Sequence, residues 1–131
     1  MIIDQQILDD LSEKAKKSPR LRANYDLRNS PEDSSQRILN AIEPGTVMQI
    51  HRHKKTSETV VCIRGHFQEC FYDEKGNLTD TIDMVPGGLV LNVPAGLWHN
   101  LISLISGTIL LSCKDGPYEP LNEEDVLERK P

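Results

Sequence analysis

The stretch that decides the fold is Gly45–Gly65, which reads GTVMQIHRHKKTSETVVCIRG. His51 and His53 lie two residues apart within it, so in a β-strand both imidazoles leave from the same face. The polar break Lys54–Ser57 precedes Glu58 and a run of β-branched residues, which predicts a second strand. If the two strands pair antiparallel, Glu58 returns beside the histidines. Two imidazoles and a carboxylate suit a divalent metal such as iron, manganese, nickel or zinc.

The spacing of this stretch resembles the first sequence signature of the cupins, Gly-x5-His-x-His-x4-Glu-x6-Gly. The second cupin signature, Gly-x5-Pro-x-Gly-x2-His-x3-Asn, is matched from Gly88 to His99, and Ser103 stands in the place of its final Asn. The resemblance implies a cupin jelly roll, a small double-stranded β-helix. It also implies a metal site with four ligands, which are His51, His53, Glu58 and His99.

Composition places the chain among globular proteins and excludes some partners. It has 131 residues, enough for one domain with a single core, and 27 % of them are charged. The net charge of −5 argues against nucleic acid or an anionic membrane as a partner. No apolar run reaches the length of a membrane span, and the first residues do not resemble a signal peptide. We therefore expect a cytoplasmic protein whose three cysteines are reduced.

The rest of the chain predicts one helix followed by many short strands. Asp4–Lys17 has an N-cap residue and one apolar stripe, which is typical of a packing helix. Turn residues then separate short apolar runs, which indicates an all-β fold with a short N-terminal helix and a C-terminal tail. The predicted strands are 36–42, 46–53, 58–63, 66–72, 78–84, 89–93, 98–103 and 108–114, and a closing helix is predicted at Asn122–Arg129. We expect three parts: an N-terminal helix and arm packing on the barrel or a partner (1–35), the cupin domain (36–120) and a tail with room for a short helix (121–131).

Strand alternation predicts which side chains face the barrel interior. If the two motif histidines point inward, Val47 and Gln49 point inward too, as do Val60 and Cys62 on the next strand. The remaining apolar residues then point outward and need a cover, either the N-terminal helix or a second subunit in a homodimer. These outward residues are Met48, Ile50, Val61 and Ile63. For residues 66–72 two alternatives stay open, since either His66, Gln68, Cys70 and Tyr72 or Phe67, Glu69 and Phe71 face the interior.

Several residues are candidates for contacting a small-molecule ligand. Arg20 and Arg22 alternate with apolar residues, which fits either a solvated edge strand or a strip that binds an anion. Gln49 is a polar residue predicted to face inward, and Trp98 is placed either at the mouth of the pocket or in the core. The candidates for proton transfer are Glu69 and Tyr118.

Further blocks of the chain resemble the WbuC type of small bacterial cupins. They are Ser18–Arg20 with Arg22, Gln36–Ala41, Pro44–Thr46, His51–His53, Pro94–His99 and Lys114–Tyr118. The resemblance implies a metalloprotein that handles a small molecule, such as a sugar or an anionic sugar phosphate or nucleotide sugar, in surface polysaccharide synthesis. Three functions follow: a metal-dependent enzyme of the sugar isomerase or epimerase kind, an iron-dependent dioxygenase, or a binding module without catalysis.

Overall fold

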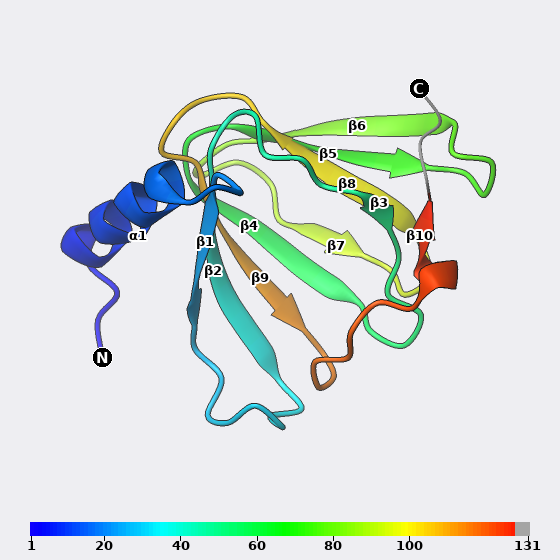
Figure 1. Cartoon of the computed structure of the whole chain (residues 1–131), viewed down its shortest axis with the longest axis horizontal. Helices are drawn as coiled ribbons and strands as arrows, with labels where there is room; N and C mark the ends of the chain where they lie inside the picture. The colour runs from blue at the N-terminus through cyan, green and yellow to red at the C-terminus, as the bar shows by residue number, and fades with distance from the viewer. Residues whose placement is uncertain (128–131) are drawn as a thin grey trace.

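The computed structural model describes residues 1–127, which form one helix and two five-stranded sheets (Figure 1). Every pair of neighbouring strands is antiparallel. The first sheet has the order β1 (Arg22–Asp26), β2 (Gln36–Ile42), β9 (Ile109–Lys114), β4 (Glu58–Arg64) and β7 (Leu91–Val93). The second has the order β10 (Val126–Leu127), β3 (Ile50–His51), β8 (Trp98–Ser103), β5 (Phe67–Tyr72) and β6 (Leu78–Met84). This all-β jelly roll with one short helix agrees with the predicted fold class.

The chain passes from the first sheet to the second at Gly65, between β4 and β5. Its φ of +81° lies in the left-handed region that glycine adopts without strain. A Cβ at this position would lie 2.6 Å from the Cα of Thr108. The second glycine of the first motif is therefore required by the backbone, because it allows the two sheets to approach closely where they join.

The two sheets enclose an apolar core that closes one end of the molecule. Phe67 and Met84 from the second sheet are fully buried against Val60 and Cys62 from the first. Phe71 belongs to the same cluster, so on β5 the set Phe67, Glu69 and Phe71 faces the interior. This decides between the two alternatives for residues 66–72.

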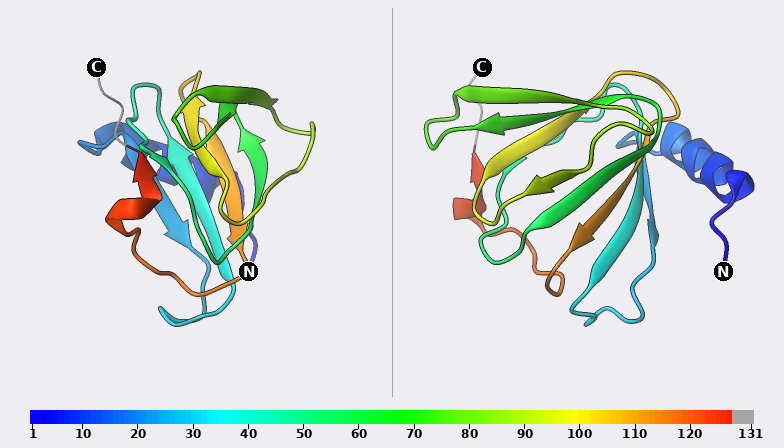
Figure 2. Two further views of the ribbon diagram at one scale, coloured as in Figure 1. Left: turned by 90° about the vertical axis from the view of Figure 1, so that its right-hand side faces the viewer. Right: turned by 180° about the vertical axis from the view of Figure 1, so that it is seen from behind.

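Helix α1 (Gln5–Lys17) covers the outer face of the first sheet, as Figures 1 and 2 show. Asp4 caps it, because its side chain accepts a hydrogen bond from the Ile7 amide. Leu8, Leu11 and Ala15 pack on the strands, and Ile63 joins this cluster. The predictions of the helix, its cap and a cover for Ile63 are confirmed. No helix within residues 1–127 combines the length and apolar character needed to cross a membrane.

The strand predicted at 46–53 is largely wrong, since only β3 is regular. Residues before β3 do not alternate as a strand would, because they leave the Pro44–Gly45 turn as irregular chain. Val47 is therefore exposed instead of inward, and Met48 packs on the inner core instead of facing outward. Ile50 does face away from the cavity, but the C-terminal strand β10 covers it through Leu127.

Two further predictions differ from the structure. The strand predicted at 89–93 begins only at Leu91, and Leu89 and Val90 are exposed, because the preceding Pro86–Gly88 turn carries them away from the sheet. The closing helix predicted at 122–129 is a single 3₁₀ turn, Glu123–Asp125, followed by β10. Pairing of β10 with β3 supplies the hydrogen bonds that a helix would otherwise supply. Residues 128 and 129 of that prediction lie outside the described residues.

Candidate metal centre

Three imidazoles converge at the open end of the space between the sheets. One ring nitrogen each from His51, His53 and His99 lies within 4.8 Å of the other two. Strand β3 pairs with β8 through His51 and His99 directly opposite each other, which brings together two motifs that are far apart in the chain. The ring centroids of these two residues are 4.4 Å apart. The predicted histidine cluster is therefore present as a geometric unit.

Backbone carbonyls hold two of the three rings. The Nδ1 atom of His51 lies 2.8 Å from the Gln49 carbonyl, and that of His99 lies 2.9 Å from the Leu97 carbonyl. Because a carbonyl only accepts, each Nδ1 donates and each Nε2 keeps its lone pair. Burial lowers the pKa of His51 and His53 to about 4 and also lowers the pKa of His99. All three rings are neutral at pH 7, which is the form that binds a metal.

Glu58, the predicted fourth ligand, lies beside the cluster. Its Oε1 is 3.7 Å from His99 Nε2, while its Oε2 accepts a hydrogen bond of 2.5 Å from Ser112 and lies 3.6 Å from Lys114 Nζ. Burial opposes ionisation of this carboxyl, yet the Lys114 charge and the Ser112 hydrogen bond outweigh it and lower the Glu58 pKa. The carboxylate is thus kept ionised within reach of the imidazoles.

A second carboxyl group, Glu69 on β5, faces the same space. The side chain is 1 % exposed, and its Oε2 has no hydrogen-bond partner within the described residues. Ligand atoms of Glu69, Glu58 and His99 lie within 4.8 Å of one another. Burial, and then the nearby Glu58 charge, raise the Glu69 pKa well above its ordinary value. Burial therefore favours the protonated form of the Glu69 carboxyl.

These groups line a cavity of about 300 Å³, at the lower end of the size range of small-molecule sites. Apolar residues form its floor, among them Val60, Leu101 and Leu110. The donor set fits a divalent metal ion, because it combines three neutral imidazoles with the Glu58 carboxylate. In addition, the buried Oε2 of Glu69 has no hydrogen-bond partner within the described residues. The bound ion would be held by His51, His53 and His99, with Glu58 as the fourth ligand.

The structure places the predicted ligand-contacting residues in different compartments. Gln49 and Arg22 line the cavity, whereas Arg20 and Tyr118 line an adjoining outer cleft. Tyr118 is 60 % exposed and lines the outer cleft together with His53, but not the cavity that contains all three histidines, so its role in proton transfer stays a prediction. Trp98 does not line either space. It precedes His99, so it points to the opposite face of β8, where it packs in the core and under the Arg52 guanidinium.

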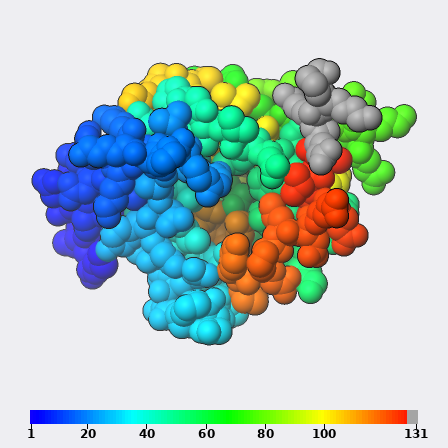
Figure 3. Space-filling model, in the orientation of Figure 1, coloured from blue at the N-terminus to red at the C-terminus, as the bar shows by residue number. Residues whose placement is uncertain are grey.

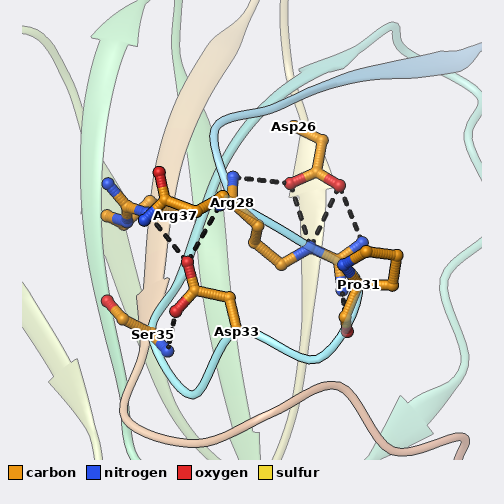
Figure 4. A network of polar contacts seen from close by, with 7 residues as sticks. Asp26, Arg28, Pro31, Asp33, Ser35 and Arg37 are labelled. Atoms are coloured by element: carbon orange, nitrogen blue, oxygen red, sulfur yellow. Dashed lines mark hydrogen bonds and ion pairs between the residues drawn. The ribbon is translucent and has the colours of Figure 1, made fainter.

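The hairpin that joins β1 to β2 contains a separate polar network (Figure 4). The Arg28 guanidinium donates to both carboxylate oxygens of Asp26, at 2.7 to 3.0 Å. Asp33 accepts from Arg37 and from the Ser35 amide. Arg28 is therefore occupied in holding the loop, whereas Arg20 and Arg22 do not belong to this network.

Four polar cavity residues were missed by sequence reasoning: Asn24, Asn40, Ser112 and Lys114. Each lies on a strand of the first sheet with the inward parity of Arg22 or Glu58. The sequence of β9 did indicate two polar residues on one face, since Ser112 and Lys114 lie two positions apart in an otherwise apolar strand. This pattern points to the cavity only when β9 is known to pair with β4.

Comparison with solved structures shows what the fold is similar to. KdgF from Halomonas sp. superposes with a TM-score of 0.61 at 14 % identity, over 79 % of this chain and 85 % of that one. An oxalate oxidase in complex with glycolate gives 0.60 at 14 % identity, over 77 % of this chain and 54 % of the other. A mutant of Bacillus subtilis oxalate decarboxylase OxdC gives 0.57 at 25 % identity, over 72 % of this chain and only 25 % of the other. The fold is the cupin jelly roll.

Comparison by sequence identifies the family. No curated protein matches the chain. A family model does match residues 3–84, which contain helix α1, the first motif and strands β1 to β6. With well over half of its length covered, the chain belongs to the family described as Domain of unknown function (DUF6016).

Proposed function

We propose that this protein is a metal-binding cupin that handles a small hydroxylated molecule in the cavity between its sheets. The observation that carries the proposal is the convergence of three neutral imidazoles, two of them paired across β3 and β8. A lone histidine on a strand is usually structural, but three whose ring nitrogens lie within 4.8 Å of one another are the arrangement expected of metal ligands. The cavity volume of about 300 Å³ suits a ligand of sugar size.

The two carboxyl groups support an enzymatic role of the isomerase or epimerase kind. A bound metal ion would polarise a carbonyl or hydroxyl oxygen of the ligand. Lys114 and Ser112 lower the pKa of Glu58, while burial raises the pKa of Glu69. Two carboxyl groups in one cavity whose pKa values are shifted in opposite directions are a common arrangement for moving a proton. In this proposal Glu69 holds the proton that the ligand receives.

Elemental analysis of the purified protein tests the metal site. We expect about one equivalent of a divalent transition metal in the parent protein and at least a ~10-fold reduction in His51→Ala and in His99→Ala. His66→Ala is the matched control, because His66 lies on the outer face and contacts Asp83 instead of the cluster. Absence of stoichiometric metal in the parent, even after reconstitution with iron, manganese, nickel and zinc, contradicts the proposal.

The finer features of the function belong to the same proposal. Resemblance to WbuC-type cupins supports a ligand drawn from surface polysaccharide synthesis and a cytoplasmic location. Exposed Ile102, Leu104 and Ile105 offer an apolar surface for the proposed homodimer. The division into an arm (1–35), a cupin domain (36–120) and a tail (121–131) also remains a proposal.

A further inference from the structure

The cavity opens into a wider outer cleft of about 650 Å³. Figure 3 shows this hollow between the β1–β2 hairpin and the orange to red C-terminal segment. Five residues line both spaces: Arg22, Gln49, His53, Lys114 and Leu121. A ligand that reaches the histidines therefore passes these five side chains, and a ligand longer than the cavity extends into the cleft.

The outer cleft is basic although the chain as a whole is acidic. Six cationic side chains line it against three carboxylates, in a chain of net charge −5. Three of these cations have carboxylate partners: Arg52 pairs with Asp125, Lys54 with Glu124 and Asp125, and Lys55 with Glu119. A fourth, Lys114, lies 3.6 Å from Glu58. Within residues 1–127, the side chains of Arg20 and Arg22 form neither an ion pair nor a hydrogen bond.

Of these two arginines, Arg22 occupies the more enclosed position. It begins β1 opposite Ile42 and is half-buried, while Arg20 is exposed at the rim. Asn24 has the same parity on β1 and lies opposite Asn40 on β2. Both amides line the cavity, so a guanidinium and two amides form one polar strip on the inner face of the sheet. A guanidinium binds an oxyanion through two parallel hydrogen bonds, and an amide both donates to and accepts from a hydroxyl group.

We infer that the ligand is a hydroxylated small molecule that carries an oxyanion, either phosphate or carboxylate. Arg22 binds the oxyanion where the cavity meets the outer cleft, with Arg20 adding positive charge at the rim. Asn24 and Asn40 contact hydroxyl groups of the ligand. The end of the ligand opposite to the oxyanion lies against the histidine cluster. Only this contact with the histidines depends on the proposed metal-binding function.

Isothermal titration calorimetry with three probes tests this inference. Glucose 6-phosphate carries a phosphate, glucuronate a carboxylate and glucose no charge. We expect the parent protein to bind at least one charged probe ~10-fold or more tightly than glucose. Arg22→Gln should weaken binding of that probe by roughly 10- to 100-fold and leave glucose unchanged. Asn24→Ala should weaken all three probes together. Whichever charged probe binds more tightly identifies the oxyanion as phosphate or carboxylate.

Arg64→Gln is the matched control, because Arg64 pairs with Asp9 on the outer side of the sheet and lines neither space. Circular dichroism and thermal melting confirm that each variant folds. The inference is overturned if neither charged probe binds more tightly than glucose, or if Arg22→Gln and Arg64→Gln change binding equally. Repeating the titrations after removal of metal with a chelator separates the two proposals. If the protein never takes up metal but still binds the charged probe selectively through Arg22, this inference holds and the metal site is refuted.

Discussion

The two faces of the first sheet differ sharply, although the same five strands form both. On the outer face, Leu39, Ala41 and Ile109 pack under helix α1. On the inner face, residues of the opposite parity on β2 and β9 line the cavity, among them Asn40 and Ser112. Strand β9 shows the contrast within four residues, since Ile109 and Leu111 face the helix while Leu110 and Ser112 face the cavity.

This difference separates stability from function. Apolar burial on the outer face stabilises the fold in proportion to the area removed from water. Burial of polar and ionisable groups in the cavity that the inner face lines costs free energy unless each group finds a partner, as Glu69 on the opposite sheet shows. Changes to the outer face should therefore alter stability and leave binding intact, while changes to the inner face should alter binding and can raise stability.

The largest expected effect is on the outer face. Leu11→Ala removes a side chain that is 2 % exposed in the helix–sheet cluster. We expect a loss of about 2–5 kcal/mol in the free energy of unfolding, measured by urea denaturation, because the cavity left behind cannot fully collapse. Metal content should stay at the parent level in the folded protein. Lys14→Ala, on the exposed side of the same helix, is the control, and equal losses in the two variants would contradict the packing described here.

Acid should destabilise the metal-free protein through the histidines of the cavity. The His51 pKa is about 4 in the folded state against an ordinary value of 6.5, so the unfolded chain binds more protons between these values. Stability is therefore complete above about pH 6.5 and falls as the pH is lowered towards 4, by up to about 3 kcal/mol for this residue. Urea denaturation from pH 7 to 4.5 measures the loss. His51→Gln should flatten the profile, and an unchanged profile would show that His51 is not buried in its neutral form.

Glu69→Gln should act in the opposite direction. Because the folded Glu69 pKa is raised above its ordinary value of 4.5, the folded state keeps a proton that the unfolded chain has lost. The resulting stability is present below pH 4.5 and is lost as the pH rises through the folded pKa. We expect the variant to gain stability relative to the parent as the pH increases from 5 to 9. Glu74→Gln, in the exposed β5–β6 hairpin, is the matched control, and an equal change in both variants would contradict the burial of Glu69.

The smallest effect concerns the helix cap on the outer side. Asp4→Ala removes the acceptor for the Ile7 amide and should cost about 1 kcal/mol, measured by thermal or urea denaturation. Asp4→Ser keeps a capping oxygen and should stay close to the parent. If both variants lose equal stability, the cap hydrogen bond is not the source of the effect.

Local patterns predicted helix α1 and most strands because the information lies within neighbouring residues. The apolar stripe and Asp4 cap located the helix, and turn residues separated β4, β5, β6 and β8. Alternation failed at Val47 and Met48, because parity holds only where a strand is paired in a sheet, and β3 begins only at Ile50. The C-terminal helix failed for a related reason, since pairing with β3 overrode the local preference of residues 122–127.

The candidate site could be predicted in part. Motif spacing nominated His51, His53, Glu58 and His99, and the structure gathers the three imidazoles with Glu58 beside them. Motif spacing could not predict the contacts of Glu58 with Ser112 and Lys114, because these residues lie more than fifty positions away on β9. It also could not predict the orientation of Glu69, which depends on the face of β5 that packs against the core.

By itself, the amino-acid sequence determined the local elements of this protein, the shared face of its two motif histidines and the glycine that lets the chain change sheets. Tertiary structure alone decided that His99 meets them across β3 and β8, that Glu69 is buried, and that Arg22 stands at the mouth of the cavity while Arg28 is bound to Asp26. The physical reason is the distance along the chain over which each interaction acts. Backbone geometry and capping act over a few residues, whereas burial, charge pairing and the meeting of ligands depend on which strands become neighbours.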